Sequence, residues 1–163
     1  MKRCTWTQDN IYNNKYHDLE WGVPVHDDRK LFEFLILDAF QAGLSWLTIL
    51  KKRENFAKAF DNFDFEKIAC YDDSKKSELL KNDRIIRNKM KIEASIQNAK
   101  SFIEIRKEFG SFDRYIWQFT GHQTVVHAFT DAKEIPSKCK ESDAMSLDLK
   151  KRGLKFVGQL NPA

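Results

Sequence analysis

Residues that break helices are rare in this chain, and this feature limits its possible folds more than any other. Only three prolines and six glycines occur in 163 residues. Between them, apolar residues recur about every three to four positions, which places them along one face of a helix, and they do not alternate as in strands. The sequence therefore predicts an all-α fold. It contains no internal repeat or linker that would indicate a second domain.

The periodicity and the capping residues beside it predict where the helices lie. The expected helical ranges are 27–42, 45–61, 64–70, 74–81, 88–108 and 142–152. Asp27 or Asp28 is a suitable N-cap for the first range, because a short acidic side chain accepts hydrogen bonds from the first amides of a helix. Gly43 and Gly110 follow the apolar patterns that they end, and Ser142 is expected to cap the last helix.

Composition excludes some classes of protein without selecting one. The longest apolar run, residues 35–40, is too short and too close to charges to cross a bilayer, so no membrane span is expected. Polar sequence follows Met1 where a secretory signal needs an apolar stretch, which predicts a cytoplasmic protein with free cysteines. The net charge of +4 permits a polyanionic partner. Each basic cluster is either a contact to such a partner or a solvated helix face.

Two short segments carry more polar and aromatic chemistry than packing requires. Residues 16–24 bring aromatic rings, an imidazole and carboxylates into a stretch without clear periodicity, which we expect to be a loop lining a pocket. Residues 41–46 are expected to form a tight break between two helices, with Leu44 at its tip and Trp46 in the first turn after Ser45. These segments are the candidates for a binding site.

Both segments resemble motifs of the 3-methyladenine DNA glycosylase I family. Further motifs follow in the family's order at residues 50–55, 85–87, 91–92, 98–99, 142–144, 150–153 and 155–158. The resemblance runs from Arg3 to Gly158 and implies one glycosylase domain, residues 1–163, of the all-helical helix-hairpin-helix type. It implies a monofunctional base-excision repair hydrolase, acting as a monomer, that flips alkylated adenine out of double-stranded DNA and cleaves its N-glycosidic bond.

The implied substrate explains why aromatic residues would be needed. Methylation at N3 makes the adenine cationic and weakens its glycosidic bond, so the enzyme must mainly extrude, recognise and hold the base. The resemblance assigns substrate binding to Tyr16, Trp21 and Trp46, whose ring faces would stack on the cation and contribute about 1–2 kcal/mol when desolvated. Core packing is the alternative role for each ring.

Asp38 is the catalytic residue that the resemblance implies. The family has a glutamate at the matching place, seven residues before Ser45, where it contacts the edge of the base. An aspartate keeps the charge but withdraws its oxygens by about 1.5 Å, so we expect a water molecule to bridge the gap. Its charge would favour a cationic base and stabilise positive charge on the sugar. The alternative is an exposed acid on a helix face.

The resemblance also implies residues that bind DNA, one apolar and four basic: Leu44, Lys51, Arg84, Arg87 and Lys89. Leu44 would fill the gap left by the extruded nucleotide, or else cover a helix–helix contact. Residues 82–87 resemble a hairpin whose amides and basic side chains hold a DNA phosphate. Arg84 stands where glycine is common in the family, and a left-handed backbone there would cost about 1 kcal/mol. The expected result is a distorted hairpin or an added phosphate contact.

Cys4 and His17 match two ligands of a structural Cys₂His₂ zinc site in the family. The family's other two ligands lie in a segment beyond about residue 158, and no donor of this chain stands at the matching places. Because structural zinc needs four protein donors, we expect weak zinc binding or none, with reduced stability. Cys4 is otherwise a small buried residue, and His17 a hydrogen-bonding group in a loop.

Two other functions compete with the glycosylase. One is a truncated, inactive relative that retains only DNA binding, which the expected loss of the zinc-ligand segment suggests. The other is a helical adaptor unrelated to DNA. An adaptor would leave residues 16–24 and 41–46 unexplained, so we favour the glycosylase.

Overall fold

The computed structural model describes residues 3–126, 136 and 138–158, and this part of the chain contains helices and no strand. The α-helices are α1 (Ile11–Leu19), α2 (Asp28–Gln41), α3 (Trp46–Ala59), α4 (Phe65–Ala69), α5 (Asp73–Lys81), α6 (Lys89–Phe109), α7 (Phe112–Trp117) and α8 (Lys140–Lys151). Short 3₁₀ helices span Thr5–Thr7, Asp61–Phe63 and Gln118–Thr120. The predicted all-α class is confirmed. None of the described helices is long and apolar enough to cross a membrane.

Capping residues define the helix boundaries largely as the sequence predicts. Asp27, Ser45 and Asn88 each accept a hydrogen bond from an amide in the first turn of α2, α3 and α6. α6 ends at Gly110, whose φ of 86° is a left-handed conformation that suits glycine. The proposed cap at Ser142 is wrong, because α8 begins earlier. Its N-cap is Cys139, whose Sγ accepts a hydrogen bond from the Ser142 amide at 3.3 Å.

Two helices were absent from the expected set. The sequence predicts a loop over residues 16–24, whereas Tyr16 and His17 lie in the last two turns of α1. The periodicity of α1 is weak because its apolar residues Ile11 and Leu19 are exposed while polar Asn13 is buried. The second is α7, which is six residues long and lies within the stretch after Gly110 for which no helix was expected.

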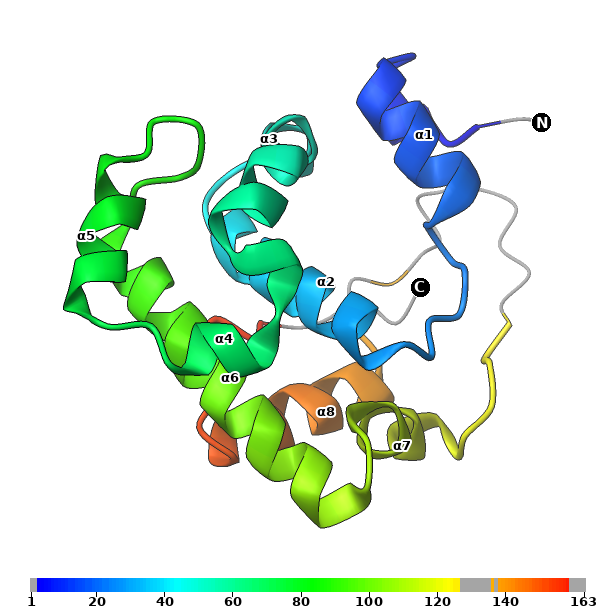
Figure 1. Cartoon of the computed structure of the whole chain (residues 1–163). Coiled ribbons are helices and arrows are strands. Elements are labelled where there is room, and N and C mark those ends of the chain that lie inside the picture. Colours follow the sequence, from blue (N-terminus) through cyan, green and yellow to red (C-terminus); the bar gives the residue numbers. More distant parts are fainter. Residues whose placement is uncertain (1–2, 127–135, 137, 159–163) are drawn as a thin grey trace.

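α6 is the helix against which most others pack. It is 21 residues long, and α2, α4, α5 and α7 contact it (Figure 1). Three fully or almost fully buried phenylalanines join these elements at the centre: the Phe102 ring stacks on Phe112 at 4.1 Å and meets the Phe32 ring edge-on at 5.0 Å. Such pairs contribute about 0.5–1.5 kcal/mol beyond the burial of their area. α2 is therefore held firmly by its apolar face.

Buried polar groups attach the segment after α8 to the helical core. Asn98 of α6 is fully buried, donates to the carbonyl of Lys155 at 3.0 Å and accepts from its amide at 2.7 Å. The Ser146 hydroxyl donates to the carbonyl of Val157 at 3.0 Å. An unpaired buried polar group costs about 1–3 kcal/mol, so any path of this segment that broke these hydrogen bonds would be unfavourable. The hydrogen bonds therefore stabilise the observed path.

A single carboxylate joins the start of α2 to the start of α7. Asp28 accepts hydrogen bonds from Nε of Arg106 at 2.6 Å and from the amides of Phe112 and Asp113 at 3.2 and 2.8 Å. The amides at the start of α7 have no acceptor within the helix, so a carboxylate from another element accepts their hydrogen bonds. Asp28 thereby fixes α7 beside the pocket described below.

We predict that Asp28→Ala lowers the free energy of unfolding by about 2–4 kcal/mol, because the change leaves two amides and a half-buried guanidinium without their acceptor. Urea denaturation followed by circular dichroism measures this difference. Glu104→Ala is the control: it removes only an exposed ion pair with Lys107 and should cost less than about 0.5 kcal/mol. Equal losses in the two variants would contradict the prediction.

Candidate active site

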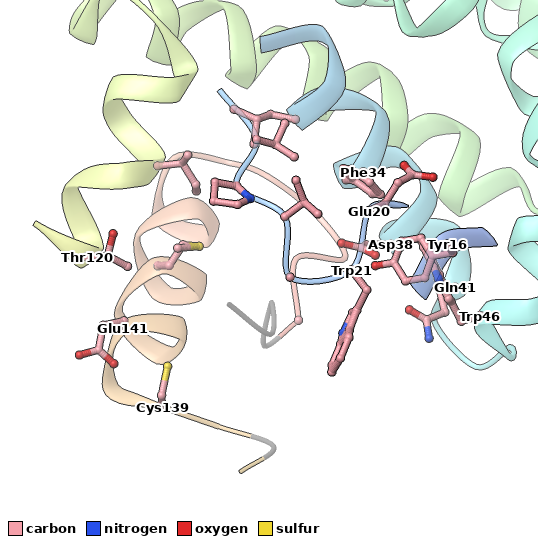
Figure 2. A pocket seen from close by; sticks show the side chains of 18 of the residues that line it. Tyr16, Glu20, Trp21, Phe34, Asp38, Gln41, Trp46, Thr120, Cys139 and Glu141 are labelled. Carbon is pink, nitrogen blue, oxygen red and sulfur yellow. The ribbon is translucent and has the colours of Figure 1, made fainter. Parts of the chain in front are cut away.

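A pocket of about 870 Å³ lies between the N-terminal and C-terminal parts of the described chain. Residues of α1, α2 and α3 line one side, and residues of α7 and α8 line the other. Figure 2 shows Tyr16, Asp38, Gln41 and Trp46 gathered on the first side, with the Trp21 ring beside them. The structure therefore brings the implied catalytic residue and all three implied substrate-binding residues into one pocket, while their roles stay predictions.

The short turn between α2 and α3, residues 42–45, brings Asp38 and Trp46 together. Gly43 takes a φ of 78°, a left-handed conformation that reverses the chain without strain. Ser45 then starts α3 by accepting a hydrogen bond from the Thr48 amide at 3.2 Å. Leu44, at the tip of the turn, is 39% exposed and lines the mouth of the pocket.

Aromatic rings from three elements form one wall of the pocket. The Tyr16 ring meets the Trp46 ring nearly edge-on, with centroids 5.4 Å apart. Trp21 is held between two other rings: His17 stacks on it at 5.3 Å, and Trp6 meets it edge-on at 5.6 Å. The rings are therefore already in place for a flat ligand, because each is fixed by a neighbouring ring.

Phe34 and Trp6 are among the pocket residues that the sequence did not point to. Phe34 lies on the same face of α2 as Asp38, four positions before it, so helical spacing was a signal that could have found it, whereas Gln41, three positions after Asp38, already lies in the candidate segment 41–46. Trp6 lines the pocket beside Trp21, but it precedes both motif segments, and no sequence signal connects it with them.

Asp38 is a carboxylate without a counter-ion. Burial alone raises its pKa to about 7, and it forms no hydrogen bond or ion pair with the described residues. The position on α2, among residues packed in the core, leaves it facing the pocket (Figure 2). The alternative of an exposed helix-face acid is wrong. A desolvated carboxylate with no protein partner attracts a cationic ligand.

Tyr16 stays neutral beside this carboxylate. Burial, and next the charge of Asp38, raises the pKa of the Tyr16 phenol to about 12. The hydroxyl therefore keeps its proton over the whole physiological range and can donate a hydrogen bond to a ligand in the pocket.

An ion network ties α1 to α2 and α3 behind the pocket. Arg53 of α3 donates two hydrogen bonds of 2.7 Å to Glu20, which follows α1, and one of 2.6 Å to Glu33 of α2. Lys30 lies within 3.1 Å of the same two carboxylates. Partial burial opposes ionisation, but the hydrogen bonds from Arg53 outweigh it and hold the pKa of Glu20 below its usual value. The network keeps Tyr16 and Trp21 at a fixed distance from Asp38.

The implied DNA-binding residues lie on the surface. Lys51, Arg84, Arg87 and Lys89 are all exposed. Within the described part of the chain, the first three form no ion pair, and Lys89 makes only a 3.9 Å contact with Glu93. Most other arginines, such as Arg53, are paired with carboxylates. These cations therefore remain available for phosphates.

The expected strain at Arg84 is wrong. Arg84 is not among the residues with positive φ. Its amide donates to the side chain of Asn82 at 3.0 Å, and Nζ of Lys52 donates to the Arg84 carbonyl at 3.1 Å. Side chains thus complete the hairpin without a left-handed residue at this position.

Cys4 and His17 lie together, but they do not make a structural zinc site by themselves. No group of three or more His, Cys, Asp or Glu residues among those described could hold a metal ion. The ring of His17 has protein partners at both nitrogens, since Nε2 accepts from the Cys4 amide at 3.4 Å and Nδ1 is 3.0 Å from Asp18. The hydrogen-bonding alternative for His17 fits this arrangement, although on a helix and not in a loop. Residues 159–163 lie outside the described part, and the zinc prediction stays a prediction.

Known proteins share this fold. Residues 6–161 match the family model described as methyladenine glycosylase. DNA-3-methyladenine glycosylase 1 of Escherichia coli is 45% identical over 159 residues, 97% of this chain and 84% of the relative. A crystal structure of 3-methyladenine DNA glycosylase I is 42% identical with a TM-score of 0.93, over 97% of this chain and 87% of that one. A tyrosine-to-phenylalanine variant of such an enzyme in complex with 3-methyladenine is 32% identical with a TM-score of 0.92, over 97% and 85%.

The helical scaffold, the aromatic pocket and these matches define a DNA glycosylase. The chain belongs to the methyladenine glycosylase family. The predictions of the family, of the all-helical glycosylase fold and of a monofunctional DNA glycosylase are therefore confirmed. The match over nearly the whole chain does not favour a relative that only binds DNA.

The raised pKa of Asp38 predicts how stability changes with pH. As pH rises above about 4, the unfolded chain releases this proton while the folded protein retains it, so folding is destabilised progressively up to about pH 7. Asp38→Asn removes the ionisation. We expect this variant to exceed the wild-type free energy of unfolding by about 1–3 kcal/mol at pH 8 and by much less at pH 4. Denaturant unfolding at both pH values measures the difference, and a difference that does not grow with pH would contradict the prediction.

Proposed function

We propose that this enzyme selects N3-methylated adenine in double-stranded DNA by the charge of the base, and that it acts as a cytoplasmic monomer. The observation that carries this proposal is the partly buried, uncompensated carboxylate of Asp38 beside the rings of Tyr16 and Trp46. An opposite charge about 5 Å away contributes about 3 kcal/mol at an effective dielectric constant of 20, which corresponds to more than a hundredfold preference. Unmodified adenine is neutral and receives none of this.

The pocket would then promote hydrolysis without a covalent enzyme intermediate. The methylated base leaves as a neutral molecule, and the sugar becomes positively charged as the glycosidic bond breaks. Asp38 would stabilise that charge while water attacks the sugar carbon. No lysine is among the described residues that line the pocket, which supports a monofunctional glycosylase without a Schiff-base step.

Base release is the direct test. A methylated duplex incubated with the wild-type protein should yield free 3-methyladenine, and Asp38→Asn should lower kcat/KM about 100-fold by removing the charge. Glu54→Gln, which removes an exposed carboxylate of α3, is the matched control and should keep full activity. Undiminished release by Asp38→Asn would exclude recognition by charge, and no release by the wild type would exclude the function itself.

Contacts to DNA would come from the turn at Leu44 and from the basic side chains around the hairpin. Leu44 would replace the extruded nucleotide in the stack. Arg84 and Arg87 project from the hairpin without ion pairs among the described residues, so they would neutralise phosphates.

The double substitution Arg84→Gln with Arg87→Gln should weaken binding to DNA of any sequence and reduce the slope of log K against log salt concentration by about 2, close to 0.9 per lost phosphate contact. Fluorescence anisotropy at several salt concentrations measures the slope. Lys100→Gln with Lys107→Gln removes the same charge from exposed positions further along α6 and should leave the slope nearly unchanged. The same slope change in both double variants would indicate a nonspecific effect of net charge.

Weak zinc binding is also proposed, because Cys4 and His17 supply only two of the four donors that structural zinc requires, and no group of three or more donors lies among the described residues. The protein should retain less than one zinc per chain after dialysis, and a chelator should leave its melting temperature nearly unchanged. One tightly held zinc, with a large fall in melting temperature on chelation, would show that other donors complete the site.

A further inference from the structure

A buried lysine lies behind the turn that separates Asp38 from Trp46. Lys91, in the first turn of α6, is 6% exposed. Its Nζ donates to the carbonyl of Phe40 at 2.8 Å and to the carbonyl of Ala42 at 2.6 Å. Burying an ammonium group costs several kcal/mol unless its donors are satisfied, so this residue is not a solvated charge on a helix face.

The two acceptors define what this lysine does for α2. The last carbonyls of a helix have no partner within the helix and form the negative end of its dipole. Lys91 satisfies two carbonyls at the end of α2, directly before Gly43 and Leu44. The ammonium therefore fixes the place where the helix stops and the turn begins.

The same residue is tied to the phosphate-binding hairpin. Lys91 lies three residues after Asn88, which follows the hairpin of residues 82–87, and its amide donates to the side chain of Asn88 at 3.1 Å. On the other side, Lys52 of α3 donates to the hairpin carbonyls of Asp83 and Arg84 at 3.4 and 3.1 Å. Since α3 begins with Trp46, directly after the turn, these hydrogen bonds form a closed loop of contacts that runs through the turn, α3, the hairpin and α6.

We propose that Lys91 is a positioning residue for base extrusion, which holds the turn carrying Leu44 at a fixed place relative to the hairpin. This inference rests on the proposed function, in which the hairpin holds a phosphate and Leu44 enters the stack. If the connection is rigid, phosphate binding at the hairpin presses the DNA against Leu44 and favours extrusion of the base. None of the binding free energy is then lost in displacing the turn. Without this connection, the hairpin would still bind, but Leu44 would no longer be aligned with the gap.

Lys91→Met tests this, because methionine fills similar space without donors. We expect the single-turnover rate on a methylated duplex to fall about 10- to 100-fold. The affinity for free 3-methyladenine, measured by tryptophan fluorescence, should change less than about threefold, since binding the free base requires no extrusion. Lys100→Met, at an exposed position of the same helix, should leave both values unchanged. Equal losses of free-base affinity and duplex rate would overturn the proposal by showing that the pocket itself collapses.

A double-variant cycle separates positioning from general stability. If Lys91 acts through Leu44, Leu44→Ala should add little to the loss caused by Lys91→Met, whereas independent losses would multiply and overturn the proposal. Should Lys91→Met not fold, Lys52→Met breaks the same closed loop of contacts at a less buried bond. Lys52→Met should then lower the single-turnover rate on the duplex and leave the affinity for the free base unchanged. An unchanged rate on the duplex would refute the proposed connection between the hairpin and the turn. A wild-type protein that releases no base would instead reject the underlying function.

Discussion

The carboxyl group of Asp38 is partly buried and has no counter-ion among the described residues, and the arrangement of the site depends on this constraint. Rotation of α2 could relieve it, but Phe32, Ile36 and Phe40 are fully buried on the other face of the helix and prevent rotation. Burial of such side chains contributes about 1.5–3 kcal/mol each, which offsets the cost of one desolvated carboxylate. The free folded protein therefore holds a carboxyl group that is about half ionised near pH 7, and a cationic ligand in the pocket would favour its charged form.

Two sets of charged hydrogen bonds hold the elements around the pocket in place. The Arg53 network joins the end of α1 to α2 and α3, while Lys91 and Lys52 connect the hairpin with the turn at Gly43. In each connection, one charged side chain donates hydrogen bonds to two or more acceptors. The relative positions of the joined elements therefore do not depend on any single hydrogen bond. In the mechanism that we propose, these few side chains link recognition of the base with its extrusion from DNA.

Local patterns predicted most of the fold but only part of the site. Caps such as Asp27 and Ser45 are readable because their partners lie three residues away. α1 was missed because its apolar residues Ile11 and Leu19 are exposed while the polar Asn13 is buried. The pairing of Arg53 with Glu20 joins residues 33 positions apart, and no local pattern encodes such a contact. Resemblance to a family selected the pocket residues, while their shared environment became visible only in the structure.

The titration of Asp38 tests the account of charge recognition most directly. Carboxyl-carbon NMR of selectively labelled aspartate, assigned with Asp38→Asn, gives the pKa of this group in the free protein and in the complex with 3,9-dimethyladeninium, whose alkylated N9 keeps the positive charge that free 3-methyladenine lacks. We predict a pKa near 7 in the free protein and a clearly lower value when the cationic base is bound, because an opposite charge favours the carboxylate. An ordinary pKa near 4 that does not change on binding would contradict it.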